Sequence, residues 1–235
     1  MNADRKIAVV AGVLFITATV AGILSVAFTG PVLGTPDYLV KISANETRVI
    51  IGALFALIMA FACAGIGISL YPVLRKYNEG LAIGSVGFRI IEGMLYVVGV
   101  VGLLLQMALS REFVKAGAPG SSYFQTSGVL IRTGSDWVSD FAAVLAWCLG
   151  ALMYYYIFYQ SKLIPRWLST WGLVGCTLTI SGCMLAMFHL ISLWSTIHVI
   201  LNLPIALQEM VLAVWLIVKG FDSPQTGSAS AQLVK

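Results

Sequence analysis

Long apolar stretches alternate with short polar segments along the whole chain. Six stretches each hold enough apolar residues for a helix to cross the hydrocarbon layer, which takes about 20 residues. Their bounds are 7–29, 46–72, 81–110, 135–160, 166–191 and 195–219. The strict alternation of apolar and polar residues that marks strands is absent. The pattern predicts an all-α protein, a six-helix transmembrane bundle over residues 1–221, with a disordered tail at 222–235.

Composition agrees with a membrane location. Of the 235 residues, 59% are hydrophobic and 10% are charged, whereas a soluble domain is about a quarter charged. The first apolar stretch is longer than the roughly 7–15 residues of a secretory signal. We therefore expect it to remain in the protein as the first helix.

Lysine and arginine residues predict the orientation of the bundle, because they gather in cytoplasmic loops. With the amino terminus inside, eight of them fall on the inner side and five on the outer side. We therefore expect both termini, including the tail, to be cytoplasmic in a multi-pass protein of the cell (inner) membrane. The net charge of +4 reflects this topology and does not indicate nucleic acid as a partner.

Local signals predict where several helices begin. Residues 43–46, SANE, match a capping box before the second span, and residues 133–136, TGSD, are expected to act similarly before the fourth. Residues 111–134 are expected to form a long irregular loop, since KAGAPGSSYF contains Gly and Pro. Pro165 is expected at the start of the fifth helix.

Charged residues inside the third span are the strongest indication of a functional site. Arg89 and Glu92 lie one helical turn apart, and the polar face continues through Tyr96 and Gln106. A lone charge at the bilayer centre costs about 2.5–3.5 kcal/mol even on the most lenient scale. This face is therefore expected to point into the bundle.

The sixth span carries a matching polar series, which consists of His198, Asn202 and Glu209. At 1.5 Å per residue, Glu209 and Glu92 are expected at the same depth, roughly 15 Å from the inner surface. We expect Arg89 to be shared between these two carboxylates. Because two glutamates and one arginine leave a negative excess in a low dielectric, Glu209 is expected to carry a proton near neutral pH.

A second polar group is expected near the outer surface, where Asp140 and His198 would line an entrance toward the charged cluster. A metal site built from Asp140, His189 and His198 is a weak alternative, because two histidines lack a fixed third ligand. No cofactor is expected. The four cysteines fall inside predicted spans without a CxxC motif, and they are expected to be buried and unpaired.

Four runs of the sequence are distinctive in combination, namely GPVLGTPDYLVKISANETRVIIGAL, LYPVLRKYNEGLAIGSVGFRIIEGMLYVVG, IPRWLSTWGL and LPIALQEMVLAVWLIVKGF. Together they resemble a bacterial family of small polytopic membrane proteins, domain of unknown function 4386. The resemblance extends from about Lys6 to Phe221. It implies an integral membrane protein and carries over no activity, substrate or catalytic residue.

The leading functional hypothesis is an uncharacterised membrane protein, in contact with the lipid bilayer, that binds or translocates a small polar or amphiphilic ligand. In this hypothesis Arg89 holds an anionic group, Glu92 positions Arg89, and Glu209 carries a coupled proton. An intramembrane metal-dependent enzyme acting on a lipid or quinone is a second hypothesis, although no hydrolase or metalloprotease motif supports it. A third is a structural or signalling membrane partner without a substrate, and the oligomeric state is left open.

Overall fold

The chain folds into helices throughout the part that the structure describes. The computed structural model describes residues 3–118 and 123–222. Its elements are α1 Ala3–Leu33, α2 Tyr38–Ala44, α3 Glu46–Leu74, α4 Glu79–Lys115, α5 Tyr123–Asp136, the π-helix η1 Trp137–Ala142, α6 Ala143–Ser161, α7 Arg166–Met187 and α8 Thr196–Val218. Six helical segments are long and apolar enough to span a membrane, and α5, η1 and α6 together make one of them. The predicted six-helix transmembrane bundle is confirmed, while the predicted tail lies, apart from Asp222, outside the described residues.

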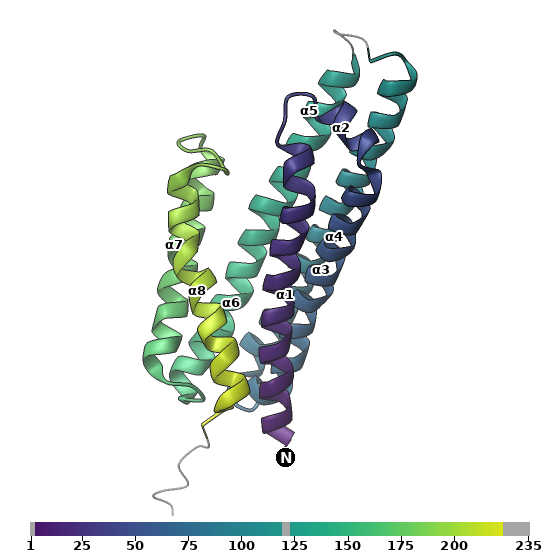
Figure 1. Ribbon diagram of the computed structural model, residues 1–235. Coiled ribbons are helices and arrows are strands. Elements are labelled where there is room, and N and C mark those ends of the chain that lie inside the picture. The colour runs from purple at the N-terminus through teal and green to yellow at the C-terminus, as the bar shows by residue number, and fades with distance from the viewer. Residues whose placement is uncertain (1–2, 119–122, 223–235) are drawn as a thin grey trace, which may run out of the picture.

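Four spans stand side by side, and the α7–α8 hairpin joins them on one side (Figure 1). α1 packs against α3, α3 against α4, and α4 against α6, while α7 packs against both α6 and α8. α8 meets α1 near the end of the bundle that holds the N-terminus, and the two helices diverge toward the opposite end (Figure 1). We call these the N-terminal end and, after the two elements found there, the α2–α5 end.

Glycines determine which helix α8 follows along its length. A Cβ atom on Gly12 would lie 2.7 Å from the carbonyl oxygen of Ala213, so the close contact of α8 with α1 requires a glycine. Farther along α8, a Cβ on Gly175 would lie 3.0 Å from the Cβ of Ile205. Small residues commonly allow such close approach between membrane helices. α8 therefore packs against α1 in one half and against α7 in the other.

The surface of the bundle is apolar and its interior contains charge. Large hydrophobic side chains such as Ile23 and Phe61 are more than 60% exposed, whereas Arg89 and Glu92 are 1% and 2% exposed. Such a surface is suited to contact with the lipid bilayer. The four cysteines are buried and free, as expected.

The predicted capping box at residues 43–46 is wrong. Ser43 belongs to α2, which continues to Ala44, so the residue before α3 is Asn45. The side chain of Asn45 donates to the carbonyl oxygen of Lys41 at 2.9 Å and does not cap α3. Glu46 instead pairs with Arg111, with N–O distances of 2.5 and 2.6 Å. An ion pair between α3 and α4 thus replaces the expected local cap.

The predicted long loop at residues 111–134 is also wrong. α4 extends to Lys115 and α5 begins at Tyr123, so helix covers most of this range. Asp136 caps no helix, because α5 continues through the π-helical turns of η1 into α6. The expectation for Pro165 is confirmed, since it directly precedes the first residue of α7.

Candidate functional site

A buried ion cluster joins α4 and α8. The Nη1 atom of Arg89 donates to Oε2 of Glu92 at 2.8 Å, and its Nη2 atom donates to Oε1 of Glu209 at 3.2 Å. The structure therefore brings together the three charged side chains that the sequence series on the third and sixth spans indicated. Two carboxylates share one guanidinium, so the cluster is one positive charge short unless a proton is present.

Only one carboxylate oxygen of Glu209 accepts hydrogen bonds from the described residues, and it accepts several. Its Oε1 atom accepts hydrogen bonds from Trp147 at 2.9 Å and from the hydroxyl of Tyr154 at 3.2 Å, in addition to Arg89. No residue that the structure describes donates to the second oxygen, Oε2. Glu209 lines a cavity and Oε2 is not fully enclosed. The carboxyl is thus fixed on one side and open on the other.

Arg89 is enclosed by its neighbours. The guanidinium carbon lies 5.6 Å from the ring centroids of both Phe15 and Tyr154, which allows cation–π contact. A Cβ on Gly67 would lie 2.9 Å from the Cβ of Arg89, and one on Gly93 would lie 2.6 Å from a carbonyl oxygen of α3. These glycines allow α3 to close over the arginine. Burial of this kind is sustained only where the charge is paired.

An inner cavity of about 120 Å³ borders the cluster. It lies between α1, α3, α4, α6 and α8. Beyond the ion cluster, its wall includes Thr19, Met59, Cys63, Tyr96 and Trp147. The cluster therefore faces a space that a small group could enter.

An outer cavity of about 210 Å³ continues from the inner one toward the α2–α5 end. Met59 and Tyr96 line both cavities, so the two spaces adjoin. The linings on α1 extend from Ala18 to Leu33, which corresponds to a path of about 22 Å along the helix. Polar groups of the outer cavity include Gln106, Ser139 and Asp140.

The opposite side of the cluster is tightly packed. Phe15 is 1% exposed, and Tyr154 and Phe158 are fully buried. The ring centroids of Tyr154 and Phe158 lie 5.9 Å apart, and those of Phe15 and Tyr154 lie 6.4 Å apart. The two cavities therefore extend from the cluster toward the α2–α5 end, and an aromatic layer lies on the other side of the cluster.

Other site residues expected from the sequence are divided between two places. Tyr96, Gln106 and Asp140 line the cavities. His198 instead packs against α7, where a Cβ on Gly182 would lie 3.3 Å from its Nδ1 atom, and Asn202 donates to the carbonyl oxygen of His198. Neither lines the two cavities. The reason is that α8 follows α7 and departs from α1 in this half (Figure 1).

The structure does not assemble the alternative metal site at Asp140, His189 and His198. Across residues 3–118 and 123–222, no group of three or more His, Cys, Asp or Glu side chains is placed to hold a metal ion. His189 has φ of 58° just after α7, and its amide and that of Leu190 bond back to the last turn. This is a Schellman-type helix end, in which the backbone of His189 takes part.

Two residues of the fourth span belong to the site although neither was expected to contact Glu209. Trp147 and Tyr154 both donate to Glu209. They follow Asp140 at intervals of seven residues, which places all three on one face of a helix. This spacing predicts their shared face with Asp140, but it does not predict that they meet Glu209 of α8.

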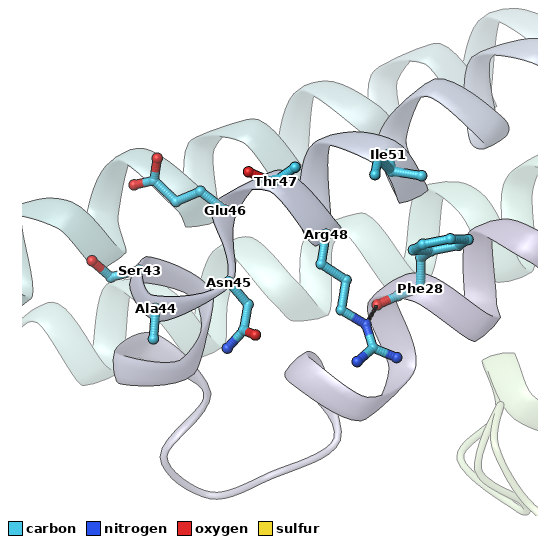
Figure 2. A pocket seen from close by; sticks show the side chains of 8 residues that line it. All are labelled: Phe28, Ser43, Ala44, Asn45, Glu46, Thr47, Arg48 and Ile51. Atoms are coloured by element: carbon cyan, nitrogen blue, oxygen red, sulfur yellow. Dashed lines mark hydrogen bonds between the residues drawn. The ribbon is translucent and has the colours of Figure 1, made fainter.

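A further surface hollow, of about 650 Å³, lies where α2 meets α3 (Figure 2). Arg48 extends there to the end of α1 and donates to the carbonyl oxygens of Phe28 at 2.8 Å and Ala27 at 3.2 Å. Pro31 lies four residues after Ala27 and has no N–H to donate. Arg48 supplies the missing donor, so this arginine stabilises the end of α1.

Comparison with known proteins identifies a family and no characterised relative. The family described as Domain of unknown function (DUF4386) has a sequence pattern that matches residues 10–220. No curated protein and no solved structure matches the chain. The match covers nearly all of the 235 residues, including every residue of the ion cluster. The chain therefore belongs to the family described as Domain of unknown function (DUF4386).

Proposed function

We propose that the protein binds a small polar or amphiphilic ligand inside the membrane, in the cavities that lead from the α2–α5 end to the Arg89, Glu92 and Glu209 cluster. The observation that carries this function is the open oxygen Oε2 of Glu209, which ends the path without a hydrogen-bond donor among the described residues. A ligand donor, such as an amine or a hydroxyl, would complete this carboxyl. Ionisable side chains inside membranes commonly mark ligand or proton pathways.

Arg89 has a different role here from the one expected from the sequence. Both of its terminal nitrogens already donate to carboxylates, at 2.8 and 3.2 Å. An anionic ligand group could bind these terminal nitrogens only by displacing Glu92 or Glu209. We therefore assign Arg89 and Glu92 to positioning Glu209, which contacts the ligand and exchanges a proton with it.

Translocation would require a further step. The layer formed by Phe15, Tyr154 and Phe158 separates the cluster from the N-terminal end. A ligand could pass only if this layer opened. Binding is therefore the part of the hypothesis that the geometry supports best, and coupled movement depends on an additional conformational change.

The test is a thermal-shift screen of purified protein in lipid nanodiscs against small amines, alcohols and carboxylates. We expect at least one compound to raise Tm of the wild type and to lose this effect in Glu209→Gln. Glu46→Gln is the matched control, because Glu46 pairs with Arg111 away from both cavities. A screen in which no stabilisation depends on Glu209 would refute ligand binding at this carboxyl.

A purely structural cluster is the second candidate, favoured by the pairing of both terminal nitrogens of Arg89 with carboxylates. It predicts that Glu209→Gln lowers Tm while the response to every compound stays unchanged. Infrared difference spectroscopy separates the two further, since a proton-exchanging Glu209 gives a pH-dependent carboxyl band that Glu209→Gln removes. A locked ion cluster gives no such band between pH 5 and 9, a window of about four units around neutrality.

A further inference from the structure

We infer that the two adjoining cavities select a cation, and that the ligand is a protonated amine on a small apolar body. This inference rests on the proposed ligand-binding function and adds the charge class of the ligand. Four carboxylates and two guanidiniums line the cavities. Even with a proton on Glu209, the lining keeps a negative excess.

Asp140 is the carboxylate that is free to act in the outer cavity. It lies in η1 and makes no hydrogen bond or ion pair with any described residue. Short π-helical segments are frequent at functional sites because they re-aim side chains. An unpaired carboxylate in a low-dielectric space attracts cations and repels anions.

Gln106 gives an independent indication of the same ligand chemistry. Its side chain is 2% exposed and lines the outer cavity, yet Oε1 has no donor among the residues that the structure describes. A buried acceptor without a partner is costly, so a donor from outside the protein would stabilise it. Open acceptors therefore lie along the path on Gln106, Asp140 and Glu209, whereas Nε of Arg89 is a buried donor without a partner among the described residues.

Arg132 supplies one of the two guanidiniums of the lining, and its described contacts are with α1 and α2. Its Nη1 atom donates to the carbonyl oxygen of Leu33 at 2.6 Å, and its guanidinium lies over the ring of Tyr38 at 5.7 Å. The arginine thus stabilises the end of α1 and packs against α2. Arg89 is likewise committed to Glu92 and Glu209.

The walls suit an amine that carries an apolar group. Val100 and Leu103 line the outer cavity beside the polar groups. Tyr96 and Trp147 line the path next to the cluster, and aromatic faces attract ammonium groups. The cavities, of about 210 and 120 Å³, reach together the lower end of the range for ligand pockets, which is roughly 300–1,000 Å³. A small aryl- or alkylamine fits these limits.

Charge selection is tested by labelling a thiol inside the outer cavity. Ser25→Cys places a near-isosteric thiol on α1, in a wall built from a different element than Asp140. Cys63→Ala removes the native thiol that lines the inner cavity, and the other three cysteines are fully buried. The reagents are the cationic 2-aminoethyl and the anionic 2-sulfonatoethyl methanethiosulfonate, with rates normalised to a free thiol in solution. The protein is the full chain in nanodiscs.

We expect the cation to react faster than the anion by on the order of tenfold, the lower end of electrostatic focusing. Asp140→Asn should lower this ratio at least threefold, while Asp37→Asn, which changes an exposed aspartate outside the cavity, should leave it unchanged. Equal normalised rates would overturn cation selection and leave ligand binding in place. No labelling by either reagent would mean that water does not reach the cavity, which overturns both.

The ligand class is tested with three compounds that share one aryl body. 2-Phenylethylammonium, 2-phenylethanol and phenylacetate differ in the charge of the head group. By titration calorimetry we expect the ammonium compound to bind at least tenfold more tightly than the alcohol, with no binding of the carboxylate. Asp140→Asn should reduce this preference. Equal or tighter binding of the alcohol or the carboxylate, or no binding of the ammonium compound, would overturn the assignment of an amine.

Discussion

Arg89 can be removed in a way that separates the energetics of the ion cluster from its chemistry. The guanidinium lies 2.8 Å from Glu92 and 3.2 Å from Glu209, and it is 1% exposed. At an effective dielectric constant near 20, each contact gives about 5–6 kcal/mol of Coulomb attraction, most of which offsets the desolvation of the charges. Arg89→Met leaves two buried carboxylates without their cation. We expect the free energy of unfolding to fall by about 3–5 kcal/mol.

The assay is reversible unfolding in mixed micelles with increasing dodecyl sulfate, followed by circular dichroism. The triple variant Arg89→Met/Glu92→Gln/Glu209→Gln should recover most of the loss, because no unpaired charge stays buried. Lys76→Met is the control. Lys76 pairs with Asp4, but both side chains are 40–55% exposed, so its loss should cost less than about 1 kcal/mol.

Two results would refute this reasoning. Arg89→Met within about 1 kcal/mol of the wild type would mean that the ion pairs do not compensate buried charge. A triple variant as unstable as the single variant would mean that packing of the arginine side chain, rather than its charge, maintains the bundle.

Three other predictions address packing, the site and topology. Gly93→Ala should lower the free energy of unfolding by at least about 2 kcal/mol, because the new Cβ would lie 2.6 Å from the carbonyl oxygen of Ala60. In Gly87→Ala on the same helix, the new Cβ meets no atom within 4 Å, so this variant should raise the free energy of unfolding by up to about 1 kcal/mol. Equal effects of the two substitutions in the same assay would contradict the packing of α3 on α4. Trp147→Phe removes one donor to Glu209 and should lower the free energy of unfolding by about 1.5–3 kcal/mol. An unchanged free energy of unfolding would mean that this hydrogen bond is absent. Two fusions after the last residue test the topology: a green fluorescent protein fusion should fluoresce, and an alkaline phosphatase fusion should be inactive, because both report a cytoplasmic C-terminus. A dark first fusion and an active second one would disprove that location.

The spans and the polar face of α4 could be predicted because they depend on local patterns. Hydrophobic stretches longer than the bilayer core define the helices, and the spacing of Arg89 and Glu92 requires that they share a face. Burial of that face follows from the cost of charge in lipid. The ion pair between Arg89 and Glu209 could also be predicted, because few other charged residues are expected at the depth of Arg89 in the membrane.

Features that depend on tertiary packing could not be predicted from the sequence. The Gly and Pro residues near 117–120 suggested a long loop, yet α4 and α5 continue as helices because they pack against each other and against α2. His198 shares a helical face with Glu209, but α8 turns to α7 through Gly175 and Gly182. A sequence pattern gives the face of a helix and not the neighbour that covers it.

The length of α4 has a practical consequence for imaging this protein. Its 37 residues extend about 55 Å, whereas a bilayer with its headgroups measures about 40–45 Å. The tip of α4, with the exposed charges of Arg111, Glu112 and Lys115, lies beside α2 and α5 (Figure 1). We therefore expect this end of the bundle to project into water. At 25.2 kDa the chain is too small to align well in electron micrographs. An antibody fragment that binds this charged tip would provide the missing mass. Because Arg89 and Glu92 lie on the same helix as the bound tip, the fragment would be joined to the ion cluster by one continuous helix.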